Sequence, residues 1–124
     1  ELQTLLDGGY TVVCDRYYYS TMVYQAQYYS QSAIASIVLA LNLRKPDLLV
    51  FLDLPIDVIA ARLQTRGSDG DRFDEVSVAT LEQYAALYRI AVREPVAAYR
   101  TLHINEPLNQ DDLLRVVLQS LQRL

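Results

Sequence analysis

Residues 48–52 form an unbroken apolar run, Leu-Leu-Val-Phe-Leu, between Pro46-Asp47 and Asp53-Leu54-Pro55. A strand that is apolar at consecutive positions needs both faces covered, whereas a strand with one wet face has alternating apolar positions. Helical patterns flank the run on both sides, and continuous apolar strands separated by helices are typical of a parallel sheet with helical crossovers. The sequence therefore predicts an α/β fold with a buried strand over residues 47–54.

Glycine, proline and capping residues divide the rest of the chain into further elements. Gly8-Gly9 closes a first helix, Pro55 is a favoured first-turn residue, and Asn109 caps the last helix. Pro95 is expected to kink or break the helix that contains it. The predicted helices are 1–7, 20–43, 55–67, 76–99 and one after residue 109, and the predicted strands are 10–14, 47–54 and 101–105.

Composition limits the class of protein. The 124 residues are 52% hydrophobic, which is enough for one core, so we expect a single domain over residues 1–124. A net charge of −4 argues against a nucleic-acid polymer or an anionic membrane as partner and leaves a small metabolite. No apolar run is long enough to cross a bilayer. The single cysteine, Cys14, falls in a predicted buried strand and fits a cytoplasmic location.

The first residue, Glu1, is not a methionine and already lies within a predicted helix. We therefore expect the sequence to be a piece of a longer protein. No glycine-rich loop of the G-x-x-x-x-G-K-[ST] type is present, and the one lysine, Lys45, precedes Pro46. This chain is not expected to hold a nucleoside triphosphate by that device.

Asp15 and Arg16 follow directly after the predicted strand 10–14. Ligands of open α/β sheets bind beyond the carboxyl ends of the strands, so a charged pair placed there is suited to a phosphate. The Arg16 guanidinium matches phosphate oxygens, and the Asp15 carboxylate is a ligand for a metal ion or its waters. The alternative interpretation is an ion pair that only orders the loop.

Polar and aromatic residues gather just after this pair. Ser20, Thr21, Tyr24 and Gln25 open the next predicted helix, and six of the ten tyrosines lie between residues 17 and 29. Tyr24 offers a ring, and Thr21 and Gln25 offer hydrogen-bonding groups, to a nucleobase or deoxyribose. The alternative, which we favour for the tyrosines at 28 and 29, is a helix interface with hydroxyl groups at its rim.

Arg62, Arg66 and Arg72 form a second group of candidate residues. The first two are one helical turn apart, and Arg72 follows a loop that contains Gly67 and Gly70. Three arginines that swing over a phosphate suit phosphoryl transfer, because positive groups stabilise the charge on the transferred oxygens. The alternative is a solvated charged face in which acidic neighbours pair with the arginines.

Two other polar residues are interpreted as structural. His103 is the only histidine and has no expected Ser or Cys partner, so a catalytic role is not predicted. Asp53 follows the apolar strand and is interpreted as a carboxylate that caps a loop.

Five motifs, in this order and spacing, resemble those of the thymidylate kinase family, nucleoside monophosphate kinases of the P-loop fold. They are Asp15-Arg16-Tyr17 with Ser20-Thr21, Tyr24-Gln25, Lys45-Pro46-Asp47-Leu48, Leu52-Asp53-Leu54-Pro55, and Arg62 to Arg72 ending in Asp71-Arg72-Phe73-Asp74. The resemblance covers essentially the whole chain and corresponds to about the C-terminal three-fifths of that family. The family's parallel sheet carries helices on both faces, and its N-terminal strand and P-loop have no counterpart in this chain.

The resemblance implies transfer of the γ-phosphoryl group of ATP-Mg to dTMP, giving dTDP. It implies that Arg16 clamps the dTMP phosphate, that Asp15 places Mg²⁺ or its waters, and that Thr21 lies near the thymine edge. Tyr24 would crowd the sugar 2′ position. A lid loop, residues 66–75, would carry Arg66 and Arg72 and work with Arg62, and the helix 20–43 would pack in a homodimer.

Two alternatives remain open at this point. One is a related kinase that prefers a different nucleotide, and the other is a non-catalytic module that dimerises or binds a nucleotide. The absent P-loop is the feature that keeps the second alternative open.

Overall fold

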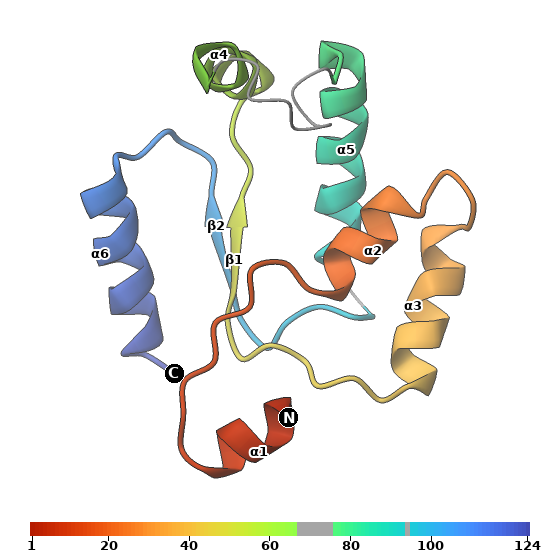
Figure 1. Cartoon of the computed structure of the whole chain (residues 1–124), viewed down its shortest axis with the longest axis vertical. Coiled ribbons are helices and arrows are strands. Elements are labelled where there is room, and N and C mark those ends of the chain that lie inside the picture. Colours follow the sequence, from red (N-terminus) through yellow and green to blue (C-terminus); the bar gives the residue numbers. More distant parts are fainter. Residues whose placement is uncertain (67–75, 94) are drawn as a thin grey trace.

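The computed structural model describes residues 1–66, 76–93 and 95–124. Two short strands lie at the centre of the structure, with α2, α3 and α5 on one side and α6 on the other (Figure 1). The elements in chain order are α1 (Leu2–Asp7), α2 (Tyr18–Tyr24), α3 (Gln31–Ala40), β1 (Leu49–Leu52), α4 (Ile56–Arg66), α5 (Val78–Ala91), β2 (Thr101–Ile104) and α6 (Gln110–Leu121). The chain is therefore a mixed α/β protein.

The strands β1 and β2 are parallel, as predicted. Leu49 pairs with Thr101 and Leu52 with Ile104, and α4 and α5 lie between the two strands in the sequence. The Asp53 N–H continues the pairing by donating to the Ile104 carbonyl at 2.8 Å. The expectation that both faces of β1 are covered was wrong, because Leu52 is 51% exposed. Within the described residues the sheet has two strands, so the other edge of β1 has no strand beside it.

Residues 10–14 were expected to form a buried strand, and this prediction was wrong. The structure assigns no strand there, Val13 is 87% exposed, and Cys14 is exposed too. A strand is stable only when a neighbour satisfies its backbone groups. Among the described residues no such neighbouring strand lies beside this segment, and of its apolar side chains only Val12 is half-buried.

The single helix expected over residues 20–43 is divided into α2 and α3. The Gln25 carbonyl accepts hydrogen bonds from the N–H groups of Tyr28 and Tyr29, which makes a turn where the helix was expected to continue. The Ser30 side chain then accepts from the Ala33 N–H at 3.2 Å and caps α3. The sequence prediction followed the apolar pattern and missed the competing cap.

The other predicted elements are present, most of them with short shifts at their ends, but the helix expected over residues 76–99 is shorter and spans Val78–Ala91. α1 ends at Gly8-Gly9, and Gly9 adopts φ 81°, a conformation that glycine accepts without strain. α5 ends at Ala91, before Pro95, and Asn109 caps α6 by accepting from the Asp112 N–H at 2.8 Å. Nowhere in residues 1–66, 76–93 and 95–124 does a helix combine the length and apolar character that a bilayer crossing needs.

The hydrophobic core joins α2 to α3 and α5. Tyr18 and Tyr19 are 6% and 4% exposed, and both hydroxyl groups donate to the Val96 carbonyl, at 2.8 and 3.1 Å. Burial raises the pKa of both tyrosines, so the hydroxyl groups stay protonated. The other buried core residues are Met22, Val23, Ile34, Ala35, Val38, Ala91 and Val96. This core fixes the first turn of α2 and therefore the residues just before it.

Candidate functional site

Arg16 lies in the short connection that enters α2, and its backbone adopts φ 70°. This left-handed conformation is strained for a residue with a side chain and persists where the surroundings impose it. The next three residues are tyrosines whose rings pack together at 4.5 Å spacings, and the second and third of them are buried in the core. The core therefore holds the backbone that aims the Arg16 side chain.

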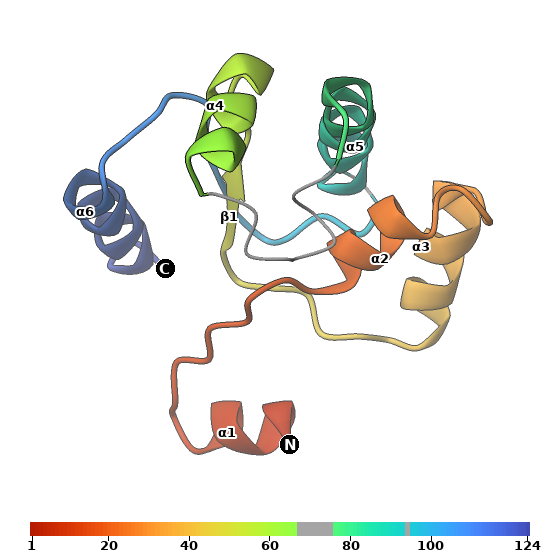
Figure 2. The same ribbon diagram turned by 45° about the horizontal axis from the view of Figure 1, so that its top comes forward.

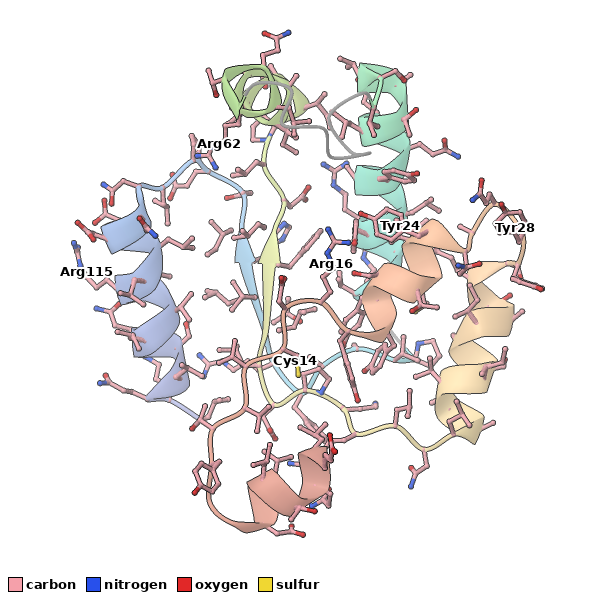
Figure 3. The ribbon with its side chains drawn as sticks, viewed as in Figure 1. Cys14, Arg16, Tyr24, Tyr28, Arg62 and Arg115 are labelled. Carbon is pink, nitrogen blue, oxygen red and sulfur yellow. The ribbon has the colours of Figure 1, made fainter. Side chains whose placement is uncertain are left out.

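The Arg16 guanidinium lies over the ring of Tyr24, 5.7 Å from its centre. A cation over an aromatic face is attracted by the ring quadrupole. Figure 3 shows the two side chains together, next to α5. Asp15, the other half of the expected phosphate and metal pair, is exposed on the same connection. The structure thus presents a guanidinium, a carboxylate and an aromatic ring within ten residues of chain.

Tyr24 is the last residue of α2, and its half-buried side chain packs against α5. Its ring meets Tyr84 edge-on at 5.1 Å and Tyr88 at 6.4 Å. Burial raises the pKa of Tyr24, a hydrogen bond with Tyr88 raises it further, and the positive charge of Arg16 acts in the opposite direction. Tyr24 is therefore a neutral phenol held by its neighbours.

The remaining substrate candidates share α2. Ser20 is half-buried, and its Oγ lies 3.0 Å from the Tyr88 hydroxyl, so either oxygen can donate. Thr21 is exposed on this helix, and Gln25 ends it by donating its N–H to the Thr21 carbonyl. The six residues predicted to bind dTMP or Mg²⁺ thus lie on one connection and on α2 with its C-cap, and they are Asp15, Arg16, Ser20, Thr21, Tyr24 and Gln25.

Asp53 is the centre of a polar junction at the carboxyl ends of β1 and β2. Arg89 of α5 donates to both carboxylate oxygens, from Nε at 3.0 and 2.9 Å and from Nη2 to Oδ1 at 2.8 Å. His103 Nε2 lies 3.0 Å from Oδ2. The Arg89 hydrogen bonds are the main cause that lowers the pKa of Asp53, and the hydrogen bond with His103 acts in the same direction. The junction ties α5 to both strands.

Aromatic contacts run from this junction to Tyr24. The His103 ring stacks on Phe51 at 5.1 Å, and Phe51 lies 6.5 Å from the Tyr88 ring. Tyr88 in turn contacts Tyr24. The end of the sheet and the Arg16 region are therefore parts of one packed assembly.

The predicted lid arginines lie elsewhere. Arg62 is exposed on α4, on the side of α6, well away from Arg16 (Figure 3). It lines a cavity of about 510 Å³ together with Leu52, Leu54, Ile59, Leu63 and Thr65. Arg66 is the last residue of α4, whereas Arg72 and residues 67–75 of the predicted lid loop lie outside the described residues.

Sequence reasoning missed the Asp53 junction and the role of Tyr88. Asp53 and His103 were interpreted as structural, and no role was predicted for Arg89. A signal was present, since Asp53 directly follows β1 and His103 lies in the parallel strand β2, whose carboxyl end meets the same edge of the sheet.

The site fits a phosphate ester and a magnesium ion. An exposed guanidinium can donate to phosphate oxygens, and Mg²⁺ is commonly held by one or two carboxylates together with substrate phosphates. The exposed Asp15 carboxylate beside Arg16 suits that kind of binding. In the described part of the chain, no three His, Cys, Asp or Glu side chains gather as they do in a closed metal site.

Comparisons with known proteins support one family. The family model described as thymidylate kinase matches residues 1–110. Thymidylate kinase of Gluconobacter oxydans is 36% identical over 101 residues, which are 77% of this chain and 47% of that protein. Thymidylate kinase of Leptospira borgpetersenii is 31% identical over 119 residues, 92% of this chain and 53% of that protein.

A probable thymidylate kinase of Staphylothermus marinus is 38% identical over 79 residues, 60% of this chain and 38% of that protein. The chain spans about half the length of the curated relatives it matches. No solved structure gave a significant match.

Proposed function

The chain belongs to the thymidylate kinase family, and on that premise we propose that it forms the dTMP-binding part of an enzyme that phosphorylates dTMP. In this reaction a phosphate oxygen of dTMP attacks the γ-phosphorus of ATP, the bond to the β-phosphate oxygen breaks, and dTDP and ADP form. The observation that carries the proposal is the placement of Arg16, a strained residue whose guanidinium lies over the Tyr24 ring.

Each residue has a task that follows from its chemistry. Arg16 binds and neutralises the dTMP phosphate, because its planar donors match two phosphate oxygens. Tyr24 packs against the sugar, where a bulky ring disfavours a 2′-hydroxyl, and Thr21 and Gln25 are available to the base. Ser20 is also proposed to be a residue of the dTMP site, because it lies on the same helix, α2.

Asp15 is the residue proposed to hold Mg²⁺ or its waters, and the ion, when bound, neutralises phosphate charge. Arg62, Arg66 and Arg72 are proposed to act on ATP and on the transferring group from the lid side. Arginines suit this task because charge spreads over the phosphoryl oxygens in the transition state. The P-loop function is assigned to a part of the protein that this chain does not contain.

A homodimer through the α2–α3 region is part of the proposal. Several apolar side chains of α3 and the segment after it are open to solvent, including Ile37 at 58%, Leu39 at 50% and Leu41 at 64% exposed. Burial of such a surface against a second copy would remove apolar area from water. Sedimentation of the protein and of an Ile37→Glu variant tests it, and a dimer that is unaffected by the charge contradicts this interface.

The experiment that tests the proposed function is a phosphoryl-transfer assay on the protein made from its natural gene. It uses ATP-Mg with dTMP, dUMP or UMP as acceptor. The proposal predicts turnover of dTMP with the largest kcat/KM of the three. A larger value for UMP identifies a kinase of different nucleotide preference, and dTMP binding without turnover identifies a non-catalytic binding module.

A further inference from the structure

Tyr88 of α5 contacts two of the residues assigned to the nucleotide site. Its hydroxyl shares a hydrogen bond with Ser20 Oγ at 3.0 Å, and its ring meets the Tyr24 ring edge-on at 6.4 Å. We infer that Tyr88 is a positioning residue, which braces α2 so that Tyr24 and Arg16 face the bound nucleotide. This inference rests on the proposed function, since it concerns the same site.

The helix that carries Tyr88 is fixed independently of α2. The next residue, Arg89, binds both carboxylate oxygens of Asp53, and His103 approaches the same carboxylate at 3.0 Å. The Asp53 side chain is only 10% exposed, so these are contacts of a largely buried carboxylate. α5 is therefore held at the end of the sheet, and Tyr88 extends this anchor to α2.

Tyr88 is better suited to this task than a phenylalanine. The side chain is half-buried, so its hydroxyl loses water on folding and needs a partner, which Ser20 provides. The centre of the Phe51 ring lies 6.5 Å from the centre of the Tyr88 ring. By contrast, Tyr28 and Tyr29 on the turn after α2 are 70% and 63% exposed, and Figure 3 shows Tyr28 pointing away from Arg16.

The contact between Tyr88 and α2 is expected to affect the binding of dTMP and not that of ATP. If the Ser20–Tyr88 hydrogen bond, one of the contacts between α2 and α5, is lost, Tyr24 and the Arg16 cation above it sample more positions, and these side chains have to be ordered when the nucleotide binds. The free-energy cost of this ordering therefore weakens the binding of dTMP. ATP, whose proposed partners lie on α4 and beyond the described residues, is not affected by the Ser20–Tyr88 contact.

The test uses Tyr88→Phe in the protein made from its natural gene, with Tyr99→Phe as the matched control. Tyr99 is 75% exposed on the connection to β2, so this control removes a hydroxyl far less buried than that of Tyr88. For Tyr88→Phe we expect the KM for dTMP to rise about fivefold, the effect of one neutral hydrogen bond. The KM for ATP and kcat should stay within about twofold of wild type. Ser20→Ala should give a smaller rise, because Tyr88→Phe also removes the hydrogen bond between Tyr88 and Tyr24. The double variant should add little to the effect of Tyr88→Phe, because the Ser20–Tyr88 bond is already broken in that variant.

Two results separate this inference from the proposed function. In the ligand-free protein, the ¹³Cζ signal of Tyr24 should move in Tyr88→Phe more than in Tyr99→Phe, because its hydroxyl loses a neighbour. An unmoved Tyr24 signal overturns the brace whether or not dTMP binds. A wild-type KM for dTMP in Tyr88→Phe, or an equal rise in the KM for ATP, overturns the positioning role and leaves the proposed function standing. Absence of dTMP turnover and binding in wild type overturns both.

Discussion

Asp53→Asn is expected to destabilise the protein because it removes the charge that joins β1, β2 and α5. The carboxylate is 10% exposed and accepts three short contacts from Arg89 and one from His103. Asparagine has the same size but accepts through one oxygen only, and its amide nitrogen would face the donors of Arg89. The substitution therefore breaks a charge-assisted pair without creating a cavity.

The expected loss in the free energy of unfolding is about 2 kcal/mol. Hydrogen bonds to charged groups contribute roughly 1.5–3 kcal/mol in net terms. The Arg89 side chain is 48% exposed, so water can replace part of the hydrogen bonding that Arg89 loses. The expected loss in free energy therefore lies in the lower half of that range. For a domain of this size, the corresponding decrease in melting temperature is about 8 °C.

The stability lost in Asp53→Asn is expected to decrease at low pH. Arg89 lowers the pKa of Asp53 in the folded protein below its ordinary value of 3.8. The stability from this pair is therefore complete above the ordinary value and is lost as the pH falls through the folded pKa. The difference between wild type and Asp53→Asn should therefore narrow as the pH falls below about 4.

Urea denaturation followed by circular dichroism, on the protein made from its natural gene, measures this difference. Asp47→Asn is the matched control, because its pair with Arg44 is longer, 3.4 Å, and both side chains are about half exposed. The control should lose less than about 0.5 kcal/mol. Equal losses for the two variants, or a difference that widens as the pH falls from 5 to 3, would refute the reasoning.

The remaining predictions concern three further side chains. Arg16→Ala should weaken binding of dTMP at least tenfold more than binding of thymidine, measured by calorimetry, because only dTMP carries the phosphate; equal losses for the two ligands speak against the clamp. Ser30→Ala should lower the free energy of unfolding by about 1 kcal/mol, read from urea denaturation, since it removes the cap on the Ala33 N–H, and an unchanged midpoint contradicts the cap. Tyr19→Phe should cost about 1 kcal/mol in the same assay because a buried hydroxyl leaves the Val96 carbonyl, and a neutral result shows that Tyr18 alone satisfies it.

The sequence predicted the elements whose signals are local. Asn109 places the start of α6 because its own side chain caps that helix, and Gly9 ends α1 through its own backbone conformation. The continuous apolar run of residues 48–52 predicted a parallel strand correctly. These features depend on neighbours within four residues or on a strong pattern, and such signals can be read from the sequence.

Two features were missed because they depend on distant partners. Residues 10–14 have the composition of a strand, yet a strand forms only beside another, and the described residues provide none there. The Asp53 junction joins positions 36 and 50 residues apart, and no local pattern marks Arg89 as the partner.

The central claim is that the nucleotide binds at the end of the segment that enters α2, a location that NMR can map directly. Protein labelled with ¹⁵N at arginine side chains and ¹³C at tyrosine rings, made from its natural gene, would be titrated with dTMP. The account predicts that the Arg16 and Tyr24 signals move, while Arg115 and the exposed Tyr28 stay unchanged (Figure 3). Figure 2 shows that α6, which carries Arg115, lies across the strands from α2. Movement of Arg115 or Tyr28 with no change at Arg16 and Tyr24 would contradict the account.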